Sequence, residues 1–297
     1  MLIQKLRPIV WCALGIFAFS ACRQEVDEPA PGFPNTGYLI SEVTQADAPS
    51  LDIKPFWLAT YYDNGSLKSL SDDRDSSYVE YAYKGREIIG KDISPPTSWR
   101  VPFAEYRLKL NDRQQVTESY LSGNDNAGGQ RYDSTAYRYD AEGYLVEQLQ
   151  RSAYLVNKRL VQHTTRMITT TWRDGNPVEI RVTDDFRPAA GPATREAFTI
   201  KQEYYPDKTD GNNIQAFLRL FGYTWTARAI PFLKAPKNLL KKVSYLAADG
   251  SKTGEWEYAY ESANVEGHEL ITRITSTETR GTSVMAPVRY AVRYHVQ

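Results

Sequence analysis

Cysteine is nearly absent from this chain of 297 residues, and its scarcity excludes several kinds of chemistry. The only two cysteines, Cys12 and Cys22, lie within the first 22 residues. The rest of the chain therefore has no disulfide, no thiolate nucleophile and no thiolate metal site. A domain of about 260 residues can bury enough apolar surface to fold without disulfide staples.

The chain also lacks an excess of charge of either sign, with 36 basic and 36 acidic residues. No cluster of lysine and arginine forms a phosphate-binding stripe, so we expect no nucleic-acid partner. His163, His268 and His295 are far apart, and none has a second metal ligand at the usual spacing. Nucleotide-binding and serine-nucleophile motifs are missing too. We therefore predict a protein that is not an enzyme and that holds no metal and no cofactor.

The first 21 residues resemble a secretory signal peptide. Lys5 and Arg7 precede a short apolar run, which small residues follow up to Cys22. The run is too short to cross about 30 Å of hydrocarbon, which takes about 20 residues. The segment Phe19-Ser20-Ala21-Cys22 resembles the bacterial lipobox, whose cysteine is acylated and becomes the mature N-terminus. We therefore predict lipidation at Cys22, with the lipid as the contact to a membrane.

Residues 22–37 are predicted to form a flexible tether. Three acidic residues and three prolines in this stretch cannot build a core. Acidic residues soon after a lipidated cysteine also resemble the signal that sends Bacteroidota lipoproteins to the outer face of the outer membrane. In this chain Arg23 and Gln24 separate the cysteine from the first acidic residue, so the signal does not decide between the two faces. We therefore expect an outer-membrane lipoprotein on either the periplasmic or the cell-surface face.

Residues 38–297, which we interpret as a single domain, show the periodicity of strands. Apolar or aromatic residues alternate with polar ones in Val79–Tyr83, Tyr106–Leu110, Trp256–Tyr260 and Val288–Val296. Such alternation places one face of each strand in a core and the other in water, which is typical of antiparallel sheets.

Tight-turn residues separate the alternating segments. They are Asp63-Asn64-Gly65, Lys84-Gly85, Asn111-Asp112, Glu142-Gly143, Asp174-Gly175 and Asp249-Gly250. Asn-Gly and Asp-Gly supply the positive φ that hairpins demand, and we expect a looser loop over Pro206–Asn213. The predicted fold is all-β: a long antiparallel meander of roughly a dozen or more strands that forms a strongly curved sheet or a barrel.

One stretch departs from the strand pattern. Ile214, Phe217, Leu218 and Phe221 recur at helical spacing, so we predict a short helical insertion over 213–221.

The hairpins resemble those of an uncharacterised family of Bacteroidota lipoproteins, a domain of unknown function described as having a porin-like fold. The resemblance rests on Tyr137–Leu145, on Thr171–Val178 and on the segment 204–243. It implies a strongly curved antiparallel sheet or barrel and no established activity. A weaker similarity links the Tyr-Asp-x-x-Gly hairpin to the tyrosine–aspartate repeats of Rhs-type shell proteins. The polar outer faces expected here argue against insertion of the strands into a membrane.

These features together favour a lipid-anchored cell-envelope protein that binds or scaffolds without catalysis. Its partner would be a glycan or another envelope protein. One alternative is a surface glycan-binding lipoprotein that assists polysaccharide uptake. Tyr223, Trp225 and Phe232 are weak candidates to contact such a ligand, because tyrosine and tryptophan can stack on sugar rings. The favoured alternative is that they fill the core beneath the predicted helix. A second alternative is a glycoside-acting enzyme, which would need two facing carboxylates.

Overall fold

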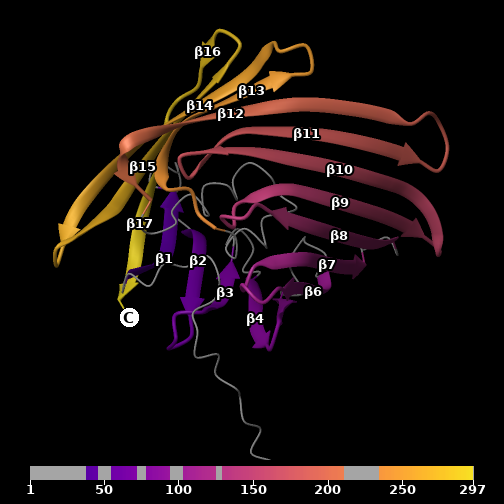
Figure 1. Cartoon of the computed structure of the whole chain (residues 1–297), viewed down its shortest axis with the longest axis horizontal. Coiled ribbons are helices and arrows are strands. Elements are labelled where there is room, and N and C mark those ends of the chain that lie inside the picture. Colours follow the sequence, from indigo (N-terminus) through magenta and orange to yellow (C-terminus); the bar gives the residue numbers. More distant parts are fainter. Residues whose placement is uncertain are drawn as a thin grey trace, which may run out of the picture.

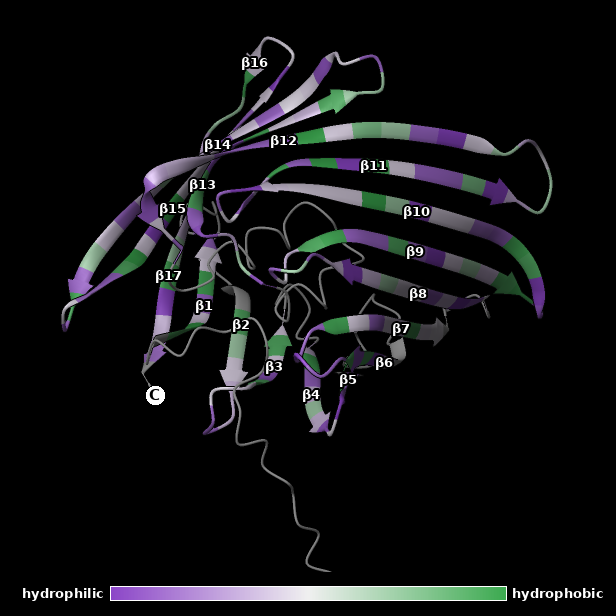
Figure 2. Ribbon diagram, viewed as in Figure 1, coloured by the Kyte–Doolittle hydropathy of each residue, from purple (hydrophilic) through white to green (hydrophobic). Residues whose placement is uncertain are grey.

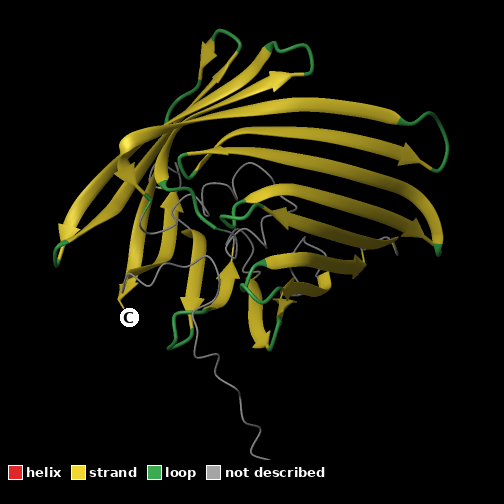
Figure 3. Ribbon diagram, in the orientation of Figure 1, coloured by secondary structure: helices red, strands yellow, loops and turns green. Residues whose placement is uncertain are grey.

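The described part of the computed structural model comprises residues 38–45, 55–71, 78–93, 103–124, 129–210 and 234–296. These residues form one sheet of seventeen strands (Figures 1 and 3). The strands are β1 (Tyr38–Gln45), β2 (Pro55–Tyr61), β3 (Leu67–Ser71), β4 (Tyr78–Lys84), β5 (Glu87–Ile93), β6 (Phe103–Leu110), β7 (Val116–Asn124), β8 (Gly129–Tyr139), β9 (Leu145–Val156), β10 (Arg159–Arg173), β11 (Asn176–Pro188), β12 (Thr194–Thr209), β13 (Asn238–Ala247), β14 (Lys252–Val265), β15 (His268–Arg280), β16 (Ser283–Val284) and β17 (Val288–Val296). Within these ranges, no helix has the length and apolar character that crossing a membrane requires.

The sheet closes on itself. From β1 to β16 each strand pairs antiparallel with the next in sequence, while β17 pairs with β15 and with β1. Sixteen strands thus form a closed ring, while β16 is a two-residue extension that pairs only with β15. The predicted all-β antiparallel fold is confirmed, and of the two expected forms it is the barrel. Closure leaves no long unpaired edge strand that could pair with another chain.

The strands fall where the sequence predicted them. The four alternating segments are parts of β4, β6, β14 and β17. The expected turn glycines adopt positive φ between strands, for example 79° at Gly65 and 80° at Gly175. The helix expected over 213–221 lies outside the described residues.

The prediction of a loop over Pro206–Asn213 is wrong for its first half, because β12 continues through Pro206 to Thr209. The register with β13 jumps from Tyr204 opposite Leu240 to Thr209 opposite Asn238. Pro206 therefore lies in an irregular part of the ladder, where its missing N–H removes no regular hydrogen bond. A proline at such a bulge is compatible with a strand, although a proline in the sequence alone suggests a loop.

The closed sheet forms the wall of the barrel, and its inner and outer faces differ in hydropathy. Figure 2 shows how hydrophobic and hydrophilic residues alternate along the strands. Inward-facing side chains from most strands pack into a large apolar cluster, and a smaller cluster comprises Ile200, Leu240 and Val243. The fully buried members of the large cluster include Val43, Leu67, Tyr81, Ile88, Leu108, Val116, Leu239 and Ile274. Charged residues alternate with several of them and face outward, such as Lys109 beside Leu108 and Arg273 beside Ile274. The barrel therefore has an apolar, tyrosine-rich interior and a polar exterior.

The recurring tyrosines of the hairpins have a common role. From the second half of one strand, an aromatic side chain donates a hydrogen bond to a backbone carbonyl near the start of the strand that precedes it around the barrel. The pairs are Tyr61 with Ile40 (2.7 Å), Tyr83 with Leu67 (2.9 Å), Tyr139 with Val116 (2.7 Å), Trp172 with Leu145 (2.8 Å), Tyr260 with Leu240 (2.8 Å) and Tyr294 with Ile271 (2.9 Å). Each ring adds apolar area to the core while its polar tip stays satisfied.

Candidate functional site

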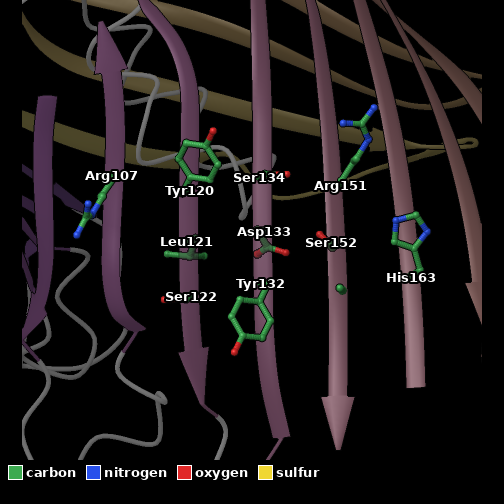
Figure 4. Close-up of a pocket in the computed structure, with 11 residues that line it drawn as sticks. Arg107, Tyr120, Leu121, Ser122, Tyr132, Asp133, Ser134, Arg151, Ser152 and His163 are labelled. Carbon is green, nitrogen blue, oxygen red and sulfur yellow. The ribbon is translucent and has the colours of Figure 1, made fainter. Parts of the chain in front are cut away.

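A cavity of about 420 Å³ opens on the outer face of the wall across β6 to β10, and we call it the outer hollow (Figure 4). Its volume lies within the range typical of small-molecule sites. The residues that line it are Arg107, Tyr120, Leu121, Ser122, Tyr132, Asp133, Ser134, Arg151, Ser152, Ala153 and His163.

The strand register explains why these side chains meet. Directly opposed residues on neighbouring strands point to the same face. One row across the strands is Arg107, Tyr120, Ser134 and Arg151. The next row is Ser122, Tyr132, Ala153 and His163. Small residues thus stand beside large ones in each row, and the large side chains form the rim of the outer hollow.

Tyr120 is held in place on its own strand. Its hydroxyl donates to the carboxylate of Glu118, and that carboxylate also accepts a hydrogen bond from Lys109 at 2.9 Å. These two donors lower the pKa of Glu118, with Tyr120 as the larger cause. The Lys109 ammonium lies 5.0 Å from the centroid of the Tyr120 ring. The ring is therefore oriented before any ligand arrives, although 40% of Tyr120 is exposed.

Tyr132 is more exposed, at 48%, and it is the second aromatic residue of the rim. It stands between Ser122 on β7 and Ala153 on β9. Both neighbours are small, so the sides of its ring are not covered by long side chains of the same row. Its hydroxyl contacts the side-chain oxygen of Gln130 at 3.5 Å.

The charge of the outer hollow is basic. Arg107 and Arg151 supply two guanidinium groups, and His163 adds an imidazole. Asp133 is the one acidic residue among the lining residues, but it lies opposite the buried Leu121, so its side chain faces inward, where Arg131 donates to both of its carboxylate oxygens at 2.8 and 3.1 Å. Arg151 forms neither a hydrogen bond nor an ion pair with another residue of the described ranges. An anionic ligand would therefore meet a guanidinium group that has no partner among the residues the structure describes.

Inside the barrel, an ion pair joins the long strands β10 and β11. Arg166 on β10 donates to both carboxylate oxygens of Asp184 on β11, each at 2.6 Å. These residues face inward beside Ile168 and Val182. A bidentate pair of this kind satisfies both charges, so it stabilises the pairing of β10 with β11 and leaves little capacity for a ligand.

The residues singled out in the sequence have different outcomes. Cys22, Tyr223, Trp225 and Phe232 lie outside the described residues, so their assignments stay predictions. His163 lies on the rim of the outer hollow. No group of three histidine, cysteine or acidic side chains suited to a metal occurs within the ranges that the structure describes.

Sequence reasoning missed the outer hollow itself. A signal was present, because Tyr120 and Tyr132 occupy the polar face of strands whose other face is apolar. An aromatic residue on the water-facing side of a strand is more informative than one on the core side. Nothing in the sequence, however, places the two tyrosines beside each other, since that depends on the register of β7 against β8.

Comparison with known proteins identifies two solved structures with this fold. A porin-like protein from Bacteroides vulgatus matches with a TM-score of 0.58 and 14% identity, over 86% of this chain and 98% of that chain. A porin-like protein from Bacteroides uniformis matches with a TM-score of 0.56 and 15% identity, over 90% of this chain and 100% of that chain. No family model matches the sequence, and no curated protein is similar to it. At such low identity the likeness shows the fold, which is porin-like as the resemblance of the hairpins implied.

Proposed function

We propose that this chain is a lipid-anchored envelope protein whose barrel stands in water and serves as a binding or scaffolding module without catalysis. The observation that carries the proposal is the character of the outer face. Barrels that span an outer membrane present an apolar band about 25 Å tall to the lipid. The wall of this barrel carries charged side chains on strand after strand instead.

Ion pairs between neighbouring strands mark this outer face around the barrel. They join Lys109 with Glu118 (2.9 Å), Arg138 with Glu147 (2.8 Å), Lys242 with Glu255 (2.9 Å), Arg273 with Glu261 (2.8 Å) and Arg293 with Glu42 (3.2 Å). A single lysine or arginine on the lipid face costs about 2–4 kcal/mol at the bilayer midplane. Several such residues make insertion of the wall unfavourable, whereas exposed pairs are well tolerated in water.

The membrane contact is then supplied by the N-terminal lipid. Cys22 would carry it, and residues 22–37 would connect it to β1, which begins at Tyr38. Several acyl chains on one cysteine are enough for stable anchoring. This arrangement suits the periplasmic or cell-surface side of an outer membrane, with another envelope protein or a glycan as partner.

A glycan-binding role is the second candidate function, and the exposed pair Tyr120 and Tyr132 favours it. Aromatic rings at the rim of a polar cavity can stack on the apolar face of a sugar ring. A glycoside-acting enzyme gains no comparable support from the outer hollow. Such enzymes use two carboxylates on either side of the scissile bond, whereas the one acidic residue among the lining residues, Asp133, faces inward opposite Leu121 and is engaged by Arg131.

The test uses the full chain expressed with its N-terminal segment. A fatty-acid analogue should label the wild type and Cys12→Ser but not Cys22→Ser. Cys22→Ser should also move from the membrane fraction to the soluble fraction with its β-sheet circular dichroism intact. Labelling of Cys22→Ser would overturn the lipid anchor. If Cys22→Ser remained membrane-embedded, resistant to alkaline extraction, the barrel itself would be inserted and the proposal of a barrel in water would be wrong.

A further inference from the structure

We infer that the outer hollow binds an acidic oligosaccharide, with Tyr120 and Tyr132 as stacking surfaces and Arg151 as the contact for a carboxylate. The inference deepens the glycan-binding candidate and rests on it. Three independent features of the described residues lead to it: the spacing of the two rings, the way Tyr120 is fixed, and the sign and placement of the charges.

The spacing of the rings suits an extended chain of sugar rings. Tyr120 lies opposite Ser134, and Tyr132 comes two residues earlier on the same strand, so the tyrosines are diagonal neighbours. Diagonal neighbours on antiparallel strands lie about 7–8 Å apart. Two rings on one face at this distance can contact successive units of one oligosaccharide, while a single small molecule would use only one of them.

The fixed orientation of Tyr120 lowers the cost of binding. Its hydroxyl donates to Glu118 and its ring lies beside the Lys109 ammonium, so its side chain is ordered without a ligand. Immobilising a free side chain on binding costs free energy that a preorganised ring avoids. Glu118 is itself occupied by Tyr120 and Lys109, which reduces its repulsion of an acidic ligand.

The placement of the charges favours an acidic sugar over a neutral one. Arg107 and Arg151 stand at the two ends of one row, three strand spacings apart, which corresponds to about 14 Å. The planar guanidinium group matches a carboxylate in bidentate geometry. Because Asp133 is engaged by Arg131 and Arg151 has no partner among the described residues, a carboxylate bound at the β9 end would meet a positive field.

The arrangement fits other anionic polymers less well. A nucleic-acid site needs a stripe of lysine and arginine that tracks successive phosphates, whereas the row has two arginines with Tyr120 and Ser134 between them. The chemistry that matches two stacking rings with a carboxylate contact at one end is a short chain of uronic acid units. Ser134 lies opposite Tyr120 and Ser122 lies opposite Tyr132, so each ring has a serine hydroxyl beside it for the sugar's own hydroxyl groups.

The test is isothermal titration calorimetry of the full lipid-anchored protein in detergent with a galacturonic acid trimer and, separately, the neutral galactose trimer. We expect the acidic trimer to bind at least tenfold more tightly, with affinity that falls as salt rises. Arg151→Gln should weaken the acidic trimer about tenfold or more and leave the neutral one unchanged. Tyr132→Ala should weaken both. Arg173→Gln and Tyr62→Ala are matched controls, since both residues are exposed and lie outside the outer hollow.

Each outcome decides a different point. Equal affinity for the two trimers would overturn the acidic specificity and keep the glycan-binding candidate. If neither trimer produced a heat of binding, both the acidic specificity and the glycan-binding candidate would be overturned. Lipid anchoring would still be judged by the labelling of Cys22. If Arg173→Gln weakened the acidic trimer as much as Arg151→Gln, the attraction would be general surface charge and the assigned site would be wrong. Thermal unfolding of every variant must match the wild type, so that lost binding reports the site and not the fold.

Discussion

Asn176 and Asn238 hydrogen-bond to each other across 62 residues of sequence. The Asn176 amide nitrogen donates to the side-chain oxygen of Asn238 at 2.9 Å, and the Asn238 backbone N–H donates to the side-chain oxygen of Asn176 at 2.8 Å. Asn238 also donates to the carbonyls of Pro206 and Lys208, both at 3.3 Å. The two amides therefore join the starts of β11 and β13 to the end of β12, where the ladder is irregular.

Replacing Asn176 should destabilise the barrel because both asparagines are buried. Asn176→Ala leaves the backbone N–H of Asn238 and its side-chain oxygen without these partners. An unsatisfied buried polar group costs about 1–3 kcal/mol. Denaturant unfolding would measure the loss, with Ser283→Ala on the exposed β16 as the control. A change below about 0.5 kcal/mol, as at a surface position, would show that the pair contributes little.

The stability that the strand-end tyrosines give the barrel should depend on their hydroxyl groups. Tyr139→Phe keeps the ring and removes the donor to the Val116 carbonyl. The expected loss is about 0.5–1.5 kcal/mol of unfolding free energy. Tyr132→Phe is the matched control because its hydroxyl is exposed and makes only a 3.5 Å contact. Equal effects of the two substitutions would contradict the structural role given to the Tyr139 hydroxyl.

Much of the fold follows from local sequence. Alternation assigns Tyr81 and Leu108 to the core and Arg107 to the surface without any knowledge of the fold. The turn at Gly175 is likewise recognisable, since its φ of 80° suits glycine. Such features are local because each depends on the geometry of a few neighbouring residues.

Closure and the outer hollow depend on contacts that local patterns do not encode. The barrel closes because Ile40 pairs with Tyr294, two residues at opposite ends of the domain. A curved open sheet would show the same alternation. The outer hollow likewise depends on register: a slip of two residues that placed Tyr120 opposite Ala136 would keep every side chain on its face and separate Tyr120 from Tyr132.

Alkaline pH should unfold the barrel through its buried tyrosines. Burial raises the pKa of Tyr137 to about 12, and burial raises the pKa of Tyr61 and Tyr139 above the ordinary value of 10.0 as well. A group whose pKa is raised by folding stabilises the native state below its unfolded pKa, and this contribution is lost as pH rises through its folded pKa. Stability should therefore fall above pH 10.0 and continue to fall toward pH 12.

Ultraviolet absorbance of tyrosinate, followed together with circular dichroism, would test this expectation. The buried tyrosines should ionise in the same pH range in which the β-sheet signal is lost. Complete ionisation at pH 10.0 with an intact β-sheet signal would contradict the burial of these hydroxyls.

Acid should remove the stabilisation that the ionised carboxylate of Glu255 provides on the outer face. Burial raises the pKa of this carboxyl, but hydrogen bonds from Lys242, Lys252 and Ser244 outweigh that effect and lower it to about 2. Because folding depresses this pKa, the stabilisation is present above the unfolded value of 4.5 and is lost as pH falls toward 2. Glu255→Gln should thus cost about 1 kcal/mol near neutral pH, and the difference from wild type should shrink on acidification. Glu261→Gln, whose ion pair with Arg273 is exposed on both sides, is the control and should cost less. A wild-type advantage over Glu255→Gln that stayed constant down to pH 2 would show that the lysine contacts do not hold the carboxylate in its charged form.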